Sequence, residues 1–223
     1  LISIGLKTKC WQFRVHETGE KAVFDLGHIA QDTKYAYRLQ VEQKELCRLA
    51  TNKAEADENI ELRMGHKFEG LRQKEGFVEI KARNKNHKEY KIQTPILIAA
   101  DGSSSEIRKT MDLEFPGLTY PETTILVATE FPFHEHIKGL SNVNYVWSKW
   151  GTYSLLKLPG IWRCSLYPDV NESIEHAVRP ESISEKLNRI VPNQNDFRVL
   201  EVRPYKIHQR ILEKYHHGRI VFV

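Results

Sequence analysis

Residues 94–108 read Thr94-Pro-Ile-Leu-Ile-Ala-Ala-Asp-Gly-Ser-Ser-Ser-Glu-Ile-Arg108. The aliphatic run 96–98 predicts a strand covered on both faces. Asp101 and Gly102 end this strand, since glycine accepts the positive φ of a tight turn. The serines that follow favour a short capped helix. A carboxylate and backbone N–H groups would then lie at the carboxyl edge of a sheet, where α/β folds commonly hold cofactors. A capped turn without a ligand is the alternative.

Composition indicates an ordinary soluble globular protein, because 40% of the 223 residues are hydrophobic and 28% are charged. The net charge of +4 is scattered along the chain, so nucleic acid is not an expected partner. Three distant cysteines without a CxxC pair predict neither a zinc site nor a disulfide framework. We find no segment of membrane-spanning length and no signal peptide, and we expect a cytoplasmic protein.

Both ends of the chain have the sequence pattern of secondary-structure elements that continue beyond the given residues. The chain opens without methionine inside an amphipathic segment, and it closes on the buried-strand pattern Arg219-Ile-Val-Phe-Val223. An apolar strand exposed at a natural terminus would invite aggregation. We therefore expect this segment to be the interior of a longer protein.

The first half of the chain alternates short strands with one amphipathic helix. The helix is predicted over residues 39–58, where apolar residues recur on one face. Strand patterns separated by turn residues are predicted at 9–15, 21–26, 60–63, 67–71, 77–82 and 90–93.

The second half is richer in β-branched and aromatic residues. An antiparallel sheet of about four strands is predicted, built from 123–131, 144–150, 152–158 and 161–167. Pro159-Gly160 marks a type II turn between the last two strands. A helix at 180–191 and strands at 197–205 and 220–223 follow. The fold class is therefore mixed α/β, or α+β, with an antiparallel sheet inserted into an α/β layer.

Three stretches together resemble the para-hydroxybenzoate hydroxylase-like flavoprotein monooxygenases. The first is Ala99-Ala-Asp-Gly-Ser-Ser-Ser-Glu-Ile-Arg108 with Leu113-Glu-Phe-Pro-Gly117, which resembles the internal Asp-Gly motif of that family. The second runs from residues 38–46 to 60–71, and the third covers 208–223. The family's GxGxxG and Gly-Asp motifs are absent, and we expect both to lie outside this segment.

The resemblance implies a division of the chain into three parts. Residues 1–112 would belong to a partial, Rossmann-like FAD-binding layer. Residues 113–206 would form the inserted antiparallel substrate-binding domain, and residues 207–223 would return to the FAD-binding domain.

The resemblance also implies an activity. An FAD-dependent monooxygenase would use NAD(P)H and O2 to hydroxylate a small phenolic or other aromatic substrate through a flavin C4a-hydroperoxide. The segment alone would be inactive, and a homodimer is compatible with the resemblance. A flavin-dependent reductase or halogenase of the same fold, or a non-catalytic ligand-binding module, remains an alternative.

The resemblance implies five cofactor-binding residues. Asp101 and Gly102 would lie near the ribose and pyrophosphate of FAD, and Arg108 near its phosphates. Gln43 would offer an amide to the cofactor, and Phe68 would contact adenine through its backbone. The alternatives are a helix cap for Asp101, exposed helix residues for Arg108 and Gln43, and a core strand residue for Phe68.

The inserted sheet offers an aromatic surface for a substrate. Stacking surface and hydroxyl groups could come from six residues, although half-buried sheets favour aromatics in any case: Tyr145, Trp147, Trp150, Tyr153, Trp162 and Tyr167. No catalytic residue can be assigned among them. The pairs His134/His136 and His216/His217 lack a third ligand, so no metal site is predicted. Residues 103–105 lack the elbow motif of a serine nucleophile.

Overall fold

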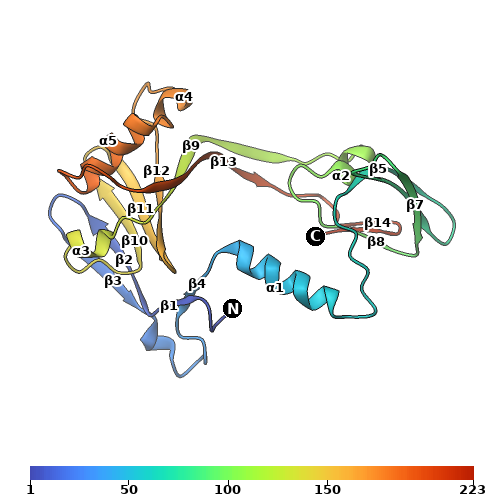
Figure 1. Ribbon diagram of the computed structural model, residues 1–223, viewed down its shortest axis with the longest axis horizontal. Helices are drawn as coiled ribbons and strands as arrows, with labels where there is room; N and C mark the ends of the chain where they lie inside the picture. The colour runs from blue at the N-terminus through green and yellow to red at the C-terminus, as the bar shows by residue number, and fades with distance from the viewer. The chain divides into compact units, whose positions relative to one another are not determined.

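The computed structural model describes residues 1–223, which divide into two compact units (Figure 1). The first unit contains Leu1–Asn52 and Tyr120–Ile207, and the second contains Lys53–Thr119 and His208–Val223. Three elements contribute residues to both units: helix α1 (Gln43–Glu55), strand β9 (Gly117–Thr129) and strand β13 (Val199–Arg210). The helices are too short or too polar for any of them to cross a bilayer.

A seven-stranded sheet organises the first unit. Its other strands are β2 (Cys10–Val15), β3 (Lys21–Asp25), β10 (Val143–Ser148), β11 (Gly151–Leu158) and β12 (Ile161–Leu166). The strand order is β13-β9-β12-β11-β10-β2-β3. Gly160 has a φ of 78°, which suits the predicted type II turn in the β11–β12 hairpin. The sheet is larger than the predicted four strands because β13 joins it beside β9, and because β2 pairs in parallel with β10 and brings β3 with it.

Helix α5 (Pro180–Ile190) packs against this sheet, as its amphipathic pattern predicts. Ile183, Leu187 and Ile190 are buried at helical spacing and share a core cluster with Val127 and Leu155 of the sheet. Proline at the first helical position suits the helix start. The smaller elements of this unit are β1 (Leu6–Thr8), paired with β4 (Arg38–Gln40), the 3₁₀ helix η1 (Leu26–Ile29), α3 (Phe133–His136) and α4 (Ile174–Ala177).

The second unit contains two small sheets. Strands β5 (His66–Gln73), β6 (Val78–Asn84) and β7 (Glu89–Thr94) form an antiparallel meander. Strand β8 (Leu97–Ala99) pairs in parallel with β15 (Ile220–Phe222), which also pairs with β14 (His216–His217). Helix α2 (Glu106–Thr110) follows β8, and its Ile107 joins a core with Val78, Ala99, Ile220 and Phe222. The mixed α/β class is therefore confirmed.

Several local predictions are wrong. Strand β8 lies at the edge of its sheet, and Ile96 and Ile98 are 58% and 63% exposed rather than covered on both faces. Residues 60–63 form no strand. Leu39 belongs to β4 because it pairs with β1, so the helix begins at Gln43.

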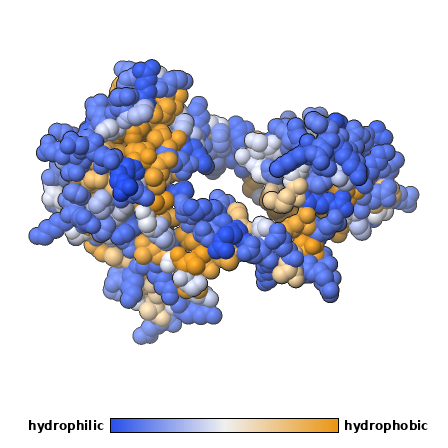
Figure 2. All heavy atoms as spheres, viewed as in Figure 1, coloured by the Kyte–Doolittle hydropathy of each residue, from blue (hydrophilic) through white to orange (hydrophobic).

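Apolar side chains reach the surface in both units, as Figure 2 shows.

The two units differ from the predicted domain boundaries at the N-terminal end. The predicted boundaries after residues 112 and 206 lie close to the observed ones after 119 and 207. Residues 1–52, however, group with the antiparallel sheet, since β2 and β3 extend it beyond β10. The parallel pairing of β2 with β10 joins segments about 130 residues apart, which local patterns in the sequence do not reveal.

Candidate functional site

The turn after β8 is fixed by the Asp101 side chain. Its Oδ2 accepts a hydrogen bond from the backbone N of Ile107 at 3.1 Å, and Ser105 Oγ accepts one from the backbone N of Arg108 at 2.9 Å. Burial opposes ionisation of Asp101, but hydrogen bonds from Ser105 and Ile107 outweigh it and lower the pKa of the carboxyl group. The carboxylate is therefore ionised at neutral pH, and it engages an N–H group of the first helical turn that was expected to be bare.

Gly102 and Arg108 lie beside this carboxylate. Gly102 has a φ of 76° and open space where a Cβ would point. The Arg108 guanidinium donates to Ser103 O at 2.8 Å and lies over the Phe115 ring at 4.5 Å. Asp101, Gly102 and Arg108 line one cavity of about 280 Å³, together with Arg210 and other residues of the second unit. We call it the turn cavity.

The other two predicted cofactor residues lie elsewhere. Phe68 is half-buried on β5 in the second unit, next to a β-bulge, and packs against the core that contains Ile107. It is not part of the turn cavity. Gln43 is exposed at the start of α1 and belongs to the first unit. The structure therefore brings three of the five predicted residues together.

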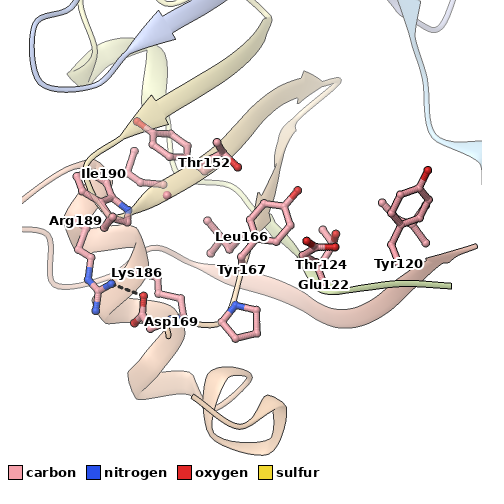
Figure 3. A pocket seen from close by; sticks show the side chains of 15 residues that line it. Tyr120, Glu122, Thr124, Thr152, Leu166, Tyr167, Asp169, Lys186, Arg189 and Ile190 are labelled. Atoms are coloured by element: carbon pink, nitrogen blue, oxygen red, sulfur yellow. Dashed lines mark hydrogen bonds and ion pairs between the residues drawn. The ribbon is translucent and has the colours of Figure 1, made fainter. Parts of the chain in front are cut away.

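Aromatic side chains of the first unit line a second cavity, of about 580 Å³ (Figure 3). Trp150, Tyr153 and Tyr167, three of the six predicted aromatics, contribute to this aromatic cavity, and so does Tyr120. The other three lie outside it. Trp162 is buried in the core, and Tyr145 and Trp147 belong to a cluster with Trp11, Phe13 and Phe24.

One wall of the aromatic cavity holds a network of ion pairs that no pattern in the sequence predicted. Lys186 is 6% exposed, and its Nζ lies 2.9 Å from Asp169 Oδ2 and 2.6 Å from Glu172 Oε2. Arg189 Nη1 lies 2.8 Å from Asp169 Oδ1 (Figure 3). One feature of the sequence could have indicated this network. Lys186 is three residues after Ile183 and four before Ile190, so it lies within the apolar stripe of the helix, where a charged side chain needs a partner.

Both carboxylates of this network are held in their charged form. For Asp169, a hydrogen bond from Arg189 and further contacts with Lys186 lower the pKa despite burial. For Glu172, burial opposes ionisation, but hydrogen bonds from Lys186, the Asp169 backbone and His176 lower the pKa to about 2. Both carboxylates are therefore ionised throughout the neutral range.

Tyr153 and three histidines of the first unit, His16, His134 and His136, have identifiable partners. His16 Nδ1 and the Tyr153 hydroxyl are 2.8 Å apart, and burial raises the pKa of Tyr153. His134 lies against the ring of Trp162, and His136 stacks on Phe131. These two histidines therefore have packing partners that account for their positions.

Comparison with protein families gives a match along nearly the whole chain. The model described as "FAD binding domain" matches residues 2–223. Para-nitrophenol 4-monooxygenase from Pseudomonas sp. (strain WBC-3) is 28% identical over 212 residues, which are 92% of this chain and 51% of the relative. 6-Hydroxy-3-succinoylpyridine 3-monooxygenase from Pseudomonas putida is 23% identical over 223 residues, which are 100% of this chain and 56% of the relative.

Solved structures share the same fold. The p-nitrophenol 4-monooxygenase of Pseudomonas putida DLL-E4 superposes with a TM-score of 0.89 at 25% identity, covering 100% of this chain and 57% of that chain. An aklavinone-11 hydroxylase in complex with FAD and aklavinone has a TM-score of 0.80 at 16% identity, and the superposition covers 96% of this chain and 43% of that chain. The chain thus spans about half the length of the curated relatives that it matches.

Proposed function

This chain belongs to the FAD binding domain family, and from that membership we propose that it is part of an FAD-dependent aromatic monooxygenase. The complete protein would use NAD(P)H and O2 to hydroxylate a phenolic or related aromatic compound. One observation carries the proposal. The chain is similar along nearly its whole length, in sequence and in fold, to nitrophenol monooxygenases.

The residues of the turn cavity fit one part of FAD. A volume of about 280 Å³ is at or below the lower limit of ligand pockets, roughly 300 Å³, so this cavity suits a sugar or phosphate rather than a whole dinucleotide. The ionised Asp101 can accept a hydrogen bond from a sugar hydroxyl. Arg108 and Arg210 add positive charge for a phosphate. Two N–H groups of the α2 first turn are already used by Asp101 and Ser105, so the phosphate would depend on the arginines.

FAD, when bound, supplies the electron transfer and the activation of oxygen. The residues of this chain would bind the cofactor, orient the aromatic ring and exclude water. The aromatic cavity is suited to the second task, because Trp150, Tyr153 and Tyr167 provide stacking surface and Tyr120 provides a hydroxyl group. Its volume of about 580 Å³ is in the range of small-molecule sites.

The test uses the complete protein purified with FAD. We expect NADPH or NADH oxidation to be slow alone and to accelerate when a phenol such as 4-nitrophenol is added, with a product into which one oxygen atom from O2 has been inserted, and with release of nitrite if that oxygen replaces the nitro group. A protein that cannot be loaded with flavin contradicts the proposal. Flavin reduction without oxygenation would indicate the reductase alternative, and a halogenated product in the presence of halide would indicate the halogenase alternative.

A further inference from the structure

The first unit contains another cavity, of about 520 Å³, whose wall is strongly basic. We call it the basic cavity. Its charged side chains are Arg14, Lys21 and Lys138, accompanied by His16 and His136, and no aspartate or glutamate lines it. The apolar part of the wall includes Val146, Leu155 and Ile190. A cavity with this wall offers a positive end and an apolar end to a ligand.

Arg14 is the most informative residue of the basic cavity. It is 7% exposed, yet it has no carboxylate partner. Nη1 donates to Gln12 Oε1 at 2.8 Å and to Gly139 O at 3.0 Å, and Nη2 donates to Lys138 O at 3.1 Å. These neutral acceptors hold the side chain in place but leave its charge uncompensated, and burying an unpaired charge is costly.

The hydrogen bonds of Arg14 also leave a defined pair of donors. A guanidinium has about five N–H donors, and three are used, so the Nε hydrogen and one Nη2 hydrogen have no acceptor on the chain. Nε and Nη2 form one edge of the planar group, and the spacing of the N–H donors along this edge matches the two oxygens of a carboxylate.

The surroundings of Arg14 do not supply the missing anion. Glu17 is next to His16 in the chain, but its Oε1 accepts a hydrogen bond from the backbone N of Lys149 at 2.8 Å, and the residue does not line the cavity. Lys21 Nζ lies 3.4 Å from Gly139 O, the carbonyl that Arg14 also contacts. Lys21 therefore adds a second positive charge close to the guanidinium.

We propose that the basic cavity binds a small organic anion, a carboxylate carried on an aromatic or aliphatic body. The carboxylate pairs with the Nε and Nη2 edge of Arg14 and is attracted by Lys21, and the apolar body lies against Val146, Leu155 and Ile190. This site is additional to the aromatic cavity, with which it shares Tyr153 and Ile190. It does not depend on the proposed hydroxylation, since it requires no flavin.

The test compares two ligands of the same shape on the complete protein. 4-Bromobenzoate carries the charge, and 4-bromobenzamide lacks it. We expect calorimetric binding of the benzoate at millimolar concentration or below, with at least tenfold weaker binding of the amide, the size of effect expected for a charged hydrogen-bonding group. In crystals soaked with 4-bromobenzoate, the anomalous signal of bromine should lie in the basic cavity.

Three variants test whether 4-bromobenzoate binds in the basic cavity. Arg14→Lys keeps the charge but removes the Nε and Nη2 edge and should weaken binding of the benzoate about tenfold or more. Lys21→Met changes an exposed side chain and should weaken binding a few-fold without affecting folding. Lys9→Met removes an exposed lysine that is not part of the cavity wall and should leave the affinity unchanged.

The proposal is overturned by any of four results. They are no benzoate binding at millimolar concentration, equal binding of acid and amide, bromine only in the aromatic cavity, or equal affinities for Lys21→Met and Lys9→Met. Inorganic phosphate that displaces 4-bromobenzoate with equal affinity would show a site for simple anions and would contradict the organic part of the proposal. If Arg14→Lys does not fold, Lys21→Met and the bromine position still decide the question.

Discussion

Lys186 Nζ lies 2.6 Å from Glu172 Oε2 within the first unit, and the two side chains are only 6% and 11% exposed. Asp169 contacts the same ammonium group and also Arg189, so these two cations and two carboxylates are linked, and Glu185 pairs with Arg189 at the surface. This network fixes the segment after β12 to helix α5 along one wall of the aromatic cavity. The proposed substrate site therefore depends on one ion pair, Lys186–Glu172, that is largely removed from water.

Replacing Lys186 should destabilise the first unit strongly. Lys186→Met leaves Glu172 without its cationic partner, and breaking a buried ion pair typically costs about 3–5 kcal/mol. The matched control is Glu185→Gln, because Glu185 pairs with Arg189 at the surface and such pairs contribute about 0–1 kcal/mol. Urea unfolding measures both values. An equal decrease in the free energy of unfolding for the two variants would show that the network contributes little to stability.

The same network predicts how the free energy of unfolding depends on pH. The pKa of Glu172 is lowered from 4.5 to about 2 in the folded protein. A depressed pKa stabilises the fold above the unfolded value, and this stabilisation is lost as the pH falls from about 4.5 to about 2. Glu172→Gln should therefore flatten the decline of the unfolding free energy in this range, whereas Glu175→Gln, at an exposed position, should not. Parallel pH profiles for the wild type and Glu172→Gln would contradict this assignment.

Asp101 has one role in folding and a second that we propose in cofactor binding, and two variants separate them. Asp101→Asn retains an oxygen that can accept from Ile107 N, so stability should change by no more than about 1 kcal/mol. Loss of the carboxylate should weaken FAD binding about tenfold, as measured by flavin fluorescence titration. Ser105→Ala removes a helix cap, costing about 0.5–2 kcal/mol, without removing charge. Unchanged FAD affinity in Asp101→Asn would mean that the carboxylate only caps the helix.

Tyr167 tests the aromatic cavity as the substrate site. Tyr167→Leu removes stacking surface worth about 0.5–1.5 kcal/mol, so the KM for a phenolic substrate should rise roughly two- to tenfold with little change in kcat. Trp147→Leu is the control, since this exposed aromatic lies on the same sheet but outside the cavity. A larger effect on KM from Trp147→Leu would place the substrate at the aromatic cluster instead.

Local patterns in the sequence predicted much of the fold. The β10–β11–β12 hairpins, helix α5 and the Asp101–Gly102 turn all depend on residues that are close together in the chain. Long-range pairings could not be predicted in this way. The parallel contact of β2 with β10 enlarges the sheet, and it also brings Arg14 beside the carbonyls of Lys138 and Gly139. The basic cavity therefore has no signal in the sequence.

The ion-pair network at the candidate site could not be predicted from local sequence patterns either. Lys186 and Asp169 are 17 residues apart, and neither belongs to a recognisable motif. The position of Lys186 in an apolar helical stripe indicates that its charge needs a partner, because buried lysines are rarely unpaired. The pattern does not say which carboxylates meet it. That information comes from the path of the chain between β12 and α5.

The most direct test of the central claim is the origin of the oxygen in the product. The complete protein, loaded with FAD and supplied with NAD(P)H and a phenolic substrate, is allowed to react under ¹⁸O₂ in ordinary water. Mass spectrometry should find one ¹⁸O atom in each hydroxylated product, because a monooxygenase takes its oxygen from O2. A product that contains oxygen only from water, or no oxygenated product at all, would contradict the account.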